Sequence, residues 1–283
     1  MDSLHAARER TATDKEGALT IWLRGQRRVA IGFSGGVDSA YLAVVARRTL
    51  GADAALAVIG RSASYPAEQW SVARSVAAAF DIAVLELDTD ELSDPNYASN
   101  PSNRCYYCKT ELWSRVAPAV RARGYDVVID GTNADDLADH RPGAQAAREH
   151  GVRSPLADLG FTKTDIRERS RALGIPTWSQ PSSPCLSSRL PYGTSVTPQR
   201  LQQVEVAERA LRALGIGGDL RVRYHDDLGR VELSSAELVR WMDPAQFVRL
   251  RDAVLSAGFA RVALDLRGFR SGSLNVLHGV TAA

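Results

Sequence analysis

The sequence has little of what secreted or membrane proteins need. Its three cysteines are sparse and odd in number for 283 residues, which argues against a disulfide framework. No apolar run approaches the roughly 20 residues that cross a bilayer, and the first residues contain no apolar core of signal-peptide length. We therefore expect a soluble, cytoplasmic protein with no membrane partner.

An excess of charge of one sign is also missing. The formal net charge is +2, and no basic region is interleaved with aromatic residues. This balance argues against a nucleic acid as partner, although it is compatible with a local basic cleft.

Apolar residues, by contrast, make up 45% of the chain, which is enough for a large core. Short apolar runs alternate with helical patterns, an arrangement that predicts βαβ units and a doubly wound, mostly parallel α/β sheet. Residues 180–198 interrupt this rhythm with four prolines and five serines. We expect an α/β domain over residues 1–190 and a smaller α+β domain over residues 191–283.

A glycine loop, SGGVDS at residues 34–39, lies between an apolar run and a helical pattern that starts near Ala40. Glycines let a backbone approach a phosphate closely, and the amides and dipole of a helix start favour its negative charge. The loop lacks the lysine of the Walker motif and the spacing of G-x-G-x-x-G. We predict that Gly35 and Gly36 hold the phosphates of a nucleotide; an ordinary turn is the alternative.

Polar side chains around this loop suggest further contacts. Ser34 and Ser39 can donate hydrogen bonds to phosphate oxygens, and Asp38, an acid beside phosphates, is expected to hold Mg²⁺. Two later turns follow the predicted strands at residues 54–59 and 126–130. Because these turns come at the carboxyl ends of parallel strands, we expect them at the same edge of the sheet as the loop. They add Ser62 and Gly131 as nucleotide-binding candidates, with ordinary polar turns as the alternative.

The cysteines form a pattern of their own. Cys105 and Cys108 make a C-x-x-C pair at a predicted helix start, and Cys185 lies in the proline-rich stretch. Three thiolates suit a [4Fe-4S] cluster whose fourth iron is open to an external sulfide or substrate. Zinc completed by a histidine, a redox-active C-x-x-C pair and chance spacing remain alternatives.

Arginines supply candidate anion ligands. The run LRVRYH at residues 220–225 predicts a strand of a hairpin, and its alternation places Arg221 and Arg223 on one face. With Arg189 of the proline-rich stretch, they are substrate-binding candidates, because paired guanidinium groups hold phosphate or carboxylate. A solvated outer face is the alternative.

Six motifs together resemble a known family. They are SGGVDSA at 34–40, NRCYYCK at 103–109, DGTNADDLADHRPG at 130–143, SPCLSSRLPYG at 183–193, RVRYHD at 221–226 and FRSGSLN at 269–275. Over nearly the whole chain they resemble the LarE-like ATP-dependent sulfur transferases of the PP-loop superfamily. The first motif is shared across the superfamily, and the third and fourth look specific to this family.

The resemblance implies a PP-loop domain, a smaller C-terminal domain and a homo-oligomer. It also implies a reaction in which ATP and Mg²⁺ adenylate carboxylates of a pyridinium mononucleotide, the substrate, which become thiocarboxylates of the nickel-pincer nucleotide. In one branch the cysteine matching Cys185 donates its own sulfur. The pattern with Cys105 and Cys108 is similar to the other branch, in which a [4Fe-4S] cluster carries sulfide from a separate donor. Arg221 and Arg223 match positions near the substrate phosphate.

These resemblances make Cys185 and Asp38 the catalytic candidates, with the other cysteines as cluster ligands. Three alternatives stay open. The first is sacrificial sulfur donation by Cys185. The second is a PP-loop tRNA thiolase, against which the near-neutral charge argues. The third is a zinc-stabilised nucleotide-binding module without turnover.

Overall fold

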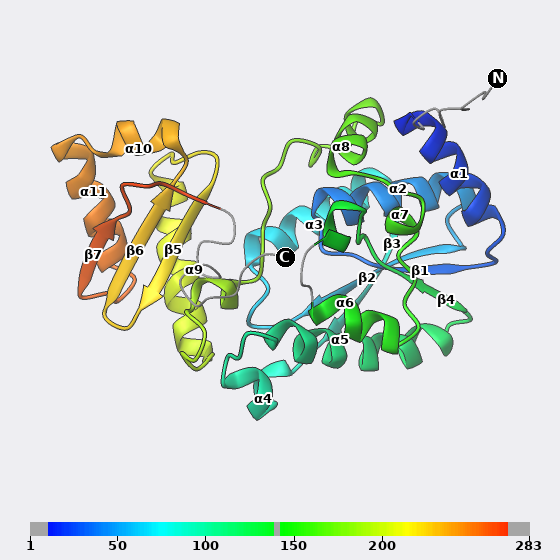
Figure 1. The fold of residues 1–283 in the computed structure, drawn as a ribbon, viewed down its shortest axis with the longest axis horizontal. Coiled ribbons are helices and arrows are strands. Elements are labelled where there is room, and N and C mark those ends of the chain that lie inside the picture. Colours follow the sequence, from blue (N-terminus) through cyan, green and yellow to red (C-terminus); the bar gives the residue numbers. More distant parts are fainter. Residues whose placement is uncertain (1–10, 139–141, 271–283) are drawn as a thin grey trace, which may run out of the picture. The chain divides into compact units, whose positions relative to one another are not determined.

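The computed structural model describes residues 11–138 and 142–270 and divides into two compact units (Figure 1). The first comprises Met1–Gly60, Gln69–Leu87 and Leu112–Gln180, and the second comprises Arg61–Glu68, Asp88–Glu111 and Pro181–Ala283. The expected domains, residues 1–190 and 191–283, stay a prediction; in the present division, residues 61–68, 88–111 and 181–190 belong to the same unit as the C-terminal part. One of them, residues 88–111, carries two of the three cysteines.

A four-stranded sheet lies at the centre of the first unit (Figure 1). Its strands, in spatial order, are β3 (Ala83–Asp88), β2 (Ala55–Arg61), β1 (Val29–Gly32) and β4 (Val127–Ile129). β1 pairs in parallel with both β2 and β4. The predicted α/β fold is therefore confirmed. The strand order reverses direction beside β1, and ligands of open parallel sheets bind at such a point.

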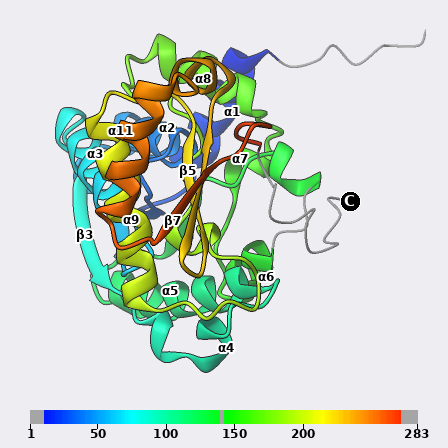
Figure 2. The ribbon, with the colours of Figure 1, turned by 90° about the vertical axis from the view of Figure 1, so that its left-hand side faces the viewer.

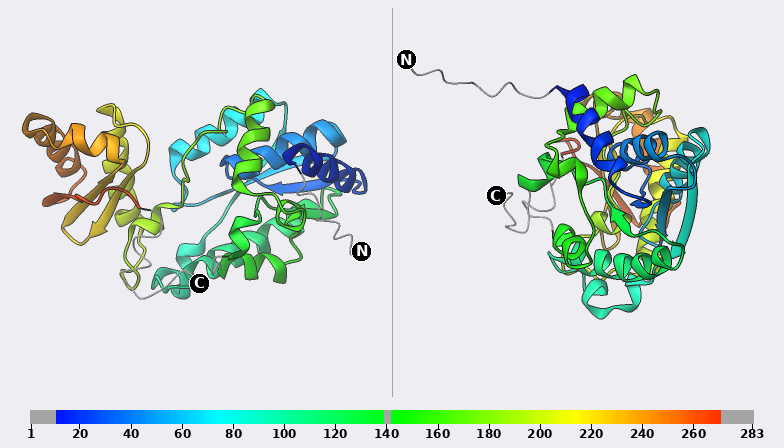
Figure 3. Two further views of the ribbon diagram at one scale, coloured as in Figure 1. Left: turned by 45° about the horizontal axis from the view of Figure 1, so that its top comes forward. Right: turned by 90° about the vertical axis from the view of Figure 1, so that its right-hand side faces the viewer.

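Helices cover both faces of this sheet (Figures 1 and 3). One face carries α1 (Ala12–Arg24), α2 (Val37–Leu50), α3 (Ala67–Ala79) and α8 (Lys163–Ala172); the other carries α5 (Arg104–Arg121) and α6 (Pro142–Glu149). On the second face, Trp113 and Val116 of α5 pack against Ala30 and Val58 of the strands. Among the helices of the described residues, none is long and apolar enough to cross a bilayer.

The second unit is built on a small mixed sheet. β5 (Leu220–His225) and β6 (Leu228–Leu233) form an antiparallel hairpin, and β7 (Arg261–Leu264) pairs in parallel with β6. Asp226, with φ of +56°, helps to close the tight turn of the hairpin, because aspartate tolerates the left-handed region. The predicted hairpin and α+β character agree with this arrangement.

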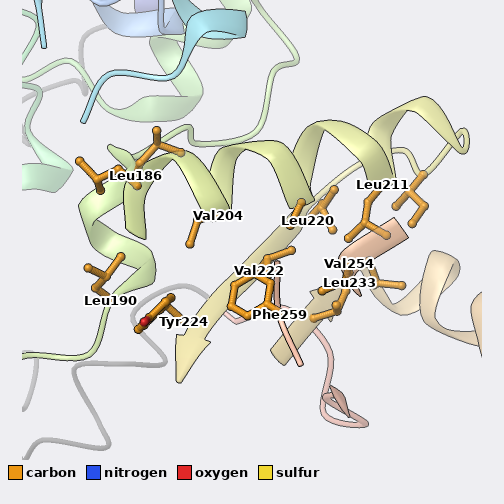
Figure 4. Packing of buried hydrophobic residues seen from close by; sticks show 14 of the residues in the cluster. Leu186, Leu190, Val204, Leu211, Leu220, Val222, Tyr224, Leu233, Val254 and Phe259 are labelled. Atoms are coloured by element: carbon orange, nitrogen blue, oxygen red, sulfur yellow. The ribbon is translucent and has the colours of Figure 1, made fainter. Parts of the chain in front are cut away.

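Helices cover one face of that sheet (Figure 2). They are α9 (Pro198–Ala213), α10 (Ser235–Trp241) and α11 (Pro244–Leu255). Figure 4 shows Val204 and Leu211 of α9 beside Leu220 and Val222 of β5, in a cluster that also contains Leu233. Leu186 and Leu190 join this core, so the stretch that contains Cys185 is anchored to it on one side.

We predict that Leu233→Ala lowers the free energy of unfolding of the second unit by about 2–5 kcal/mol, because it opens a cavity in a fully buried cluster. Leu266, which is 68% exposed, provides the matched control. Leu266→Ala should change that free energy by less than about 0.5 kcal/mol. Urea unfolding followed by circular dichroism measures both, and equal effects would contradict the assignment of this core.

Candidate active site

The glycine loop connects β1 to α2 in the first unit. α2 begins at Val37, before the predicted start near Ala40, so Asp38 and Ser39 lie in its first turn. Gly36 is the N-cap residue and gives these amides no side-chain hydrogen bond. Because the first amides of a helix lack intrahelical partners, this turn presents N–H groups and the positive end of the helix dipole to an anion.

Gly35 meets two requirements that only glycine satisfies. Its φ of +71° lies in the left-handed region. A Cβ atom here would also lie 2.7 Å from the Cβ and 2.8 Å from the Cα of Ala73 in α3. The carbonyl of Ser34 accepts a hydrogen bond from Nε2 of Gln69 at 3.0 Å. The loop is therefore fixed against α3.

The two serines of the loop bond to each other and to its backbone. Ser39 Oγ donates to the carbonyl of Gly36 at 3.1 Å and accepts from the N–H of Ser34 at 3.2 Å. The two hydroxyl oxygens lie 3.2 Å apart. Both side chains thus stabilise the loop, and their contact with phosphate stays a prediction.

Asp38 already has two polar partners. It forms an ion pair with Lys163 and accepts a hydrogen bond from Nδ2 of Asn133 at 3.3 Å. Lys163 is the first residue of α8, after a capping box formed by Thr162 and Asp165. Lys163 could not be recognised from the sequence, since the capping pattern marks the start of the helix but not the residue that the lysine contacts. Magnesium at Asp38 stays a prediction, and its binding would have to displace or share this ion pair.

Gly131 lies against the start of α2. A Cβ atom at this position would be 2.8 Å from the backbone nitrogen of Ser39. Asn133, 2% exposed, fixes the following turn, since its Oδ1 accepts the N–H groups of Asp135 at 3.0 Å and Asp136 at 3.3 Å. The ends of β1 and β4 thus meet where the strand order reverses, as expected for a ligand site.

Ser62, the remaining nucleotide-binding candidate, belongs to the second unit. Its hydroxyl lies 2.9 Å from that of Ser64, which donates to Glu91 at 2.7 Å. Glu91 is 1% exposed and also accepts from the hydroxyl of Thr89 at 3.0 Å. Ser62 therefore starts a chain of hydroxyl groups that ends on a buried carboxylate, and its contact with a nucleotide stays a prediction.

All three cysteines belong to the second unit. Cys105 and Cys108 lie near the start of α5 on one side of the helix, and Cys185 precedes the short helical turn Leu186–Arg189. Cys105 is exposed, whereas the other two are half-buried. Burial and the charge of Glu91 raise the pKa of Cys108. Although the residue Cys105 as a whole is exposed, its thiol is desolvated, and this desolvation with the charge of Cys185 raises the pKa of Cys105. The thiols are thus near enough to affect one another's ionisation.

A preformed metal site is absent from the part of the chain that the structure describes. Within residues 11–138 and 142–270, no three histidine, cysteine, aspartate or glutamate side chains are arranged to hold a metal ion. The chemistry of the donor set nevertheless fits a [4Fe-4S] cluster, because one unit contains three free cysteines, the donors that a cluster with one open iron takes. The cluster and its zinc alternative both stay predictions.

The predicted substrate-binding arginines hold the Cys185 segment. Each of them donates to backbone carbonyls of residues 182–188. Arg189 donates to the carbonyls of Pro184 at 2.6 Å and Cys185 at 3.0 Å. Arg221 donates to the carbonyl of Ser182, and Arg223 donates to that of Ser188 at 2.9 Å. Arg189, Arg221 and Arg223 are 2%, 4% and 6% exposed. The solvated-face alternative is therefore wrong, because the proline-rich segment covers this face of β5.

Two carboxylates neutralise part of this charge. Arg189 pairs with Glu208 at 2.8 Å, and Arg223 pairs with Glu232 at 2.9 Å. Burial and the charge of Arg189 lower the pKa of Arg221 to about 10. Three guanidinium groups beside two carboxylates leave a positive balance that favours an anion. Substrate contact by these arginines stays a prediction, and the sequence analysis missed their carboxylate partners.

Two of the six motifs that resemble the family lie only partly within the described residues. Arg141, in the DGTNADDLADHRPG motif, and residues 271–275, in the FRSGSLN motif, lie outside the described residues. The described parts of these motifs belong to the first and second unit, respectively.

A family model described as NAD synthase matches residues 20–105, a stretch that includes the glycine loop and Cys105. The chain is 44% identical over 248 residues to an uncharacterized protein of Synechocystis sp., covering 88% of this chain and 92% of that one. It is 37% identical over 269 residues to the pyridinium-3,5-bisthiocarboxylic acid mononucleotide synthase of Lactiplantibacillus plantarum, covering 94% and 95%. An uncharacterized protein of Methanocaldococcus jannaschii is 28% identical over 253 residues, covering 87% and 92%.

We predict that Gly131→Ala weakens ATP binding at least about tenfold, or about 1.4 kcal/mol. The added methyl group would press on the backbone of Ser39 and shift the start of α2. Gly17→Ala is the matched control, because nothing lies within 4 Å of a Cβ atom at that position. Isothermal titration calorimetry with ATP measures both variants, and unchanged affinity in Gly131→Ala would place the phosphates elsewhere.

Proposed function

Because the chain belongs to the LarE-like family of PP-loop sulfur transferases, we propose that it uses ATP to convert carboxylates of a pyridinium mononucleotide to thiocarboxylates. The relative from L. plantarum is named for a bisthiocarboxylic acid mononucleotide, which is the kind of product such a reaction gives. The reaction would belong to the assembly of the nickel-pincer nucleotide.

The observation that carries this proposal is the presence, in one chain, of a helix-start glycine loop and three free cysteines that belong to one compact unit. The loop suits triphosphate binding, and the thiols suit sulfur chemistry. A thiocarboxylate product requires both, because a carboxylate oxygen is a poor leaving group until it is activated. A nucleotide-binding module without turnover would not need the thiols.

The first step forms an acyl adenylate. A carboxylate oxygen of the substrate attacks the α-phosphorus of ATP. The bond between the α-phosphorus and the oxygen that bridges it to the β-phosphorus breaks, and pyrophosphate leaves with that oxygen. The amides at the start of α2 stabilise the negative charge that develops on the phosphates. Asp38 would hold Mg²⁺ beside them, with Lys163 as an additional cation.

The second step transfers sulfur. A sulfide nucleophile attacks the acyl carbon and expels AMP, which takes both bonding electrons of the broken C–O bond, and a thiocarboxylate remains. An already ionised sulfide needs no general base. The anionic end of the substrate would be held by Arg189, Arg221 and Arg223, whose combined charge exceeds that of their carboxylate partners.

Cys105, Cys108 and Cys185 would hold a [4Fe-4S] cluster through their thiolates. When bound, such a cluster supplies an open iron that can carry sulfide from a separate donor. We further expect a homo-oligomer that works in the cytoplasm. Sacrificial donation of the Cys185 sulfur is the alternative that the cluster experiment below distinguishes.

Asp38→Asn should lower the rate of ATP–pyrophosphate exchange by about a hundredfold or more, because the metal loses a carboxylate ligand. Asp53→Asn is the control, since Asp53 is exposed and bonds to other residues through its backbone carbonyl. Exchange is measured with labelled pyrophosphate at saturating Mg²⁺. A normal rate in Asp38→Asn would remove this residue from the metal site.

The cluster is tested by anaerobic reconstitution of the full chain with iron and sulfide. We expect a brown protein with about four iron atoms and four sulfides per chain, and loss of both in a Cys108→Ser variant. A colourless protein with stoichiometric zinc would contradict the cluster. Loss of one sulfur atom from the Cys185 peptide after turnover would identify the sacrificial route instead.

A further inference from the structure

Arg104, the residue before the C-x-x-C pair, reaches the segment that carries Cys185. Its Nη1 donates to the carbonyl of Ser187 at 3.0 Å and to Oδ1 of Asn100. Arg104 is 5% exposed. A guanidinium group of such low exposure is rarely found without a specific role, because its desolvation is costly.

Asn100 extends this connection over the following turn. It is fully buried, and its φ of +58° is in the left-handed region that asparagine tolerates. Its Nδ2 donates to the carbonyls of Pro191 at 2.7 Å and Thr194 at 2.8 Å. The backbone carbonyl of Asn100 also accepts the N–H of Gly193 at 2.9 Å.

A hydroxyl pair adds a third link between the same segments. The hydroxyl oxygens of Tyr97 and Ser187 lie 2.6 Å apart, and both residues are buried. Residues 97–104 and 185–194 are therefore joined at several points, although some 80 residues separate them in the chain. The bond from Arg104 to Ser187 is the link that connects the immediate neighbour of Cys105 to the turn after Cys185.

Electrostatics favour the same arrangement. Burial alone would lower the pKa of Arg104, but the charges of Cys185 and Cys105 raise it. The guanidinium group thus lies within the electrostatic reach of one thiol from each segment.

We infer that Arg104 is the positioning residue that brings Cys185 to Cys105 and Cys108, an inference that rests on the proposed three-thiol site. It acts through the carbonyl of Ser187 and through Asn100. The separation of Cys105 and Cys108 does not depend on Arg104, because the two residues lie three positions apart in the same helix. Arg104 therefore controls the approach of the third cysteine and leaves that of the first two unchanged.

The test is short-range cross-linking of thiols in the reduced, metal-free full chain, followed by peptide mass mapping. In the wild type we expect two products, one joining Cys105 to Cys108 and one joining Cys185 to either of them. Arg104→Gln should reduce the Cys185 product about tenfold or more, because a buried charged hydrogen bond is lost. The product within α5 should keep its yield, which reports that the helix is intact.

Arg212→Gln is the matched control. Like Arg104, Arg212 donates to backbone carbonyls, those of Ile216 at 2.9 Å and Gly218 at 2.7 Å. These two carbonyls do not belong to the segment that contains Cys185. This variant should give the wild-type yield of both products. Asn100→Gly serves if Arg104→Gln does not fold, because glycine keeps the positive φ while removing the side-chain bonds.

Three results decide the matter. Selective loss of the Cys185 product in Arg104→Gln, or in Asn100→Gly, supports the positioning role. Wild-type yields in a folded Arg104→Gln variant overturn it. Absence of any Cys185 product from the wild type overturns both this role and the three-thiol site, while the pyrophosphate exchange test of ATP activation remains separate.

Discussion

Buried guanidinium groups that donate to backbone carbonyls are the interaction on which the conformation of the segment around Cys185 depends. The segment before and after Cys185 contains four prolines and five serines and forms only one short helical turn, so most of its carbonyls lack partners in regular structure. Arg104, Arg189, Arg221 and Arg223 supply those partners. A buried carbonyl left unpaired costs about 1–3 kcal/mol. The position of Cys185 thus follows from four arginines that come from three different parts of the chain.

A related arrangement explains how the two proposed anion sites are stabilised in the absence of ligands. Arg189 and Arg223 are paired with Glu208 and Glu232, and Lys163 is paired with Asp38 beside the glycine loop. Unpaired buried charge is strongly destabilising, so the buried Arg189 and Arg223 each keep a carboxylate partner when no ligand is bound. Under the proposed function, phosphate or carboxylate groups of the ligands would share or exchange these partners. Binding at either site would then be linked to a local change in side-chain pairing.

Much of this architecture could be predicted because its signals are local. Apolar runs that alternate with helical patterns predicted the parallel α/β sheet, and glycines before a helical pattern marked the loop between β1 and α2. The burial of Arg221 and Arg223 could not be predicted, since alternation assigns a face but not what covers it. The reach of Lys163 to Asp38 and of Arg104 to Ser187 depends on long-range packing. For the same reason, the packing of residues 88–111 with the C-terminal part could not be predicted from the sequence.

The central claim is that a carboxylate is activated by adenylation before sulfur transfer. The most direct measurement uses a pyridinium carboxylate mononucleotide labelled with oxygen-18 in its carboxylates, incubated with the full chain, ATP, Mg²⁺ and sulfide. We predict that the label appears in AMP and that pyrophosphate carries none, because the carboxylate oxygen stays on the α-phosphorus when sulfur displaces AMP from the acyl carbon. Formation of ADP and phosphate, or of AMP without the label, would contradict it.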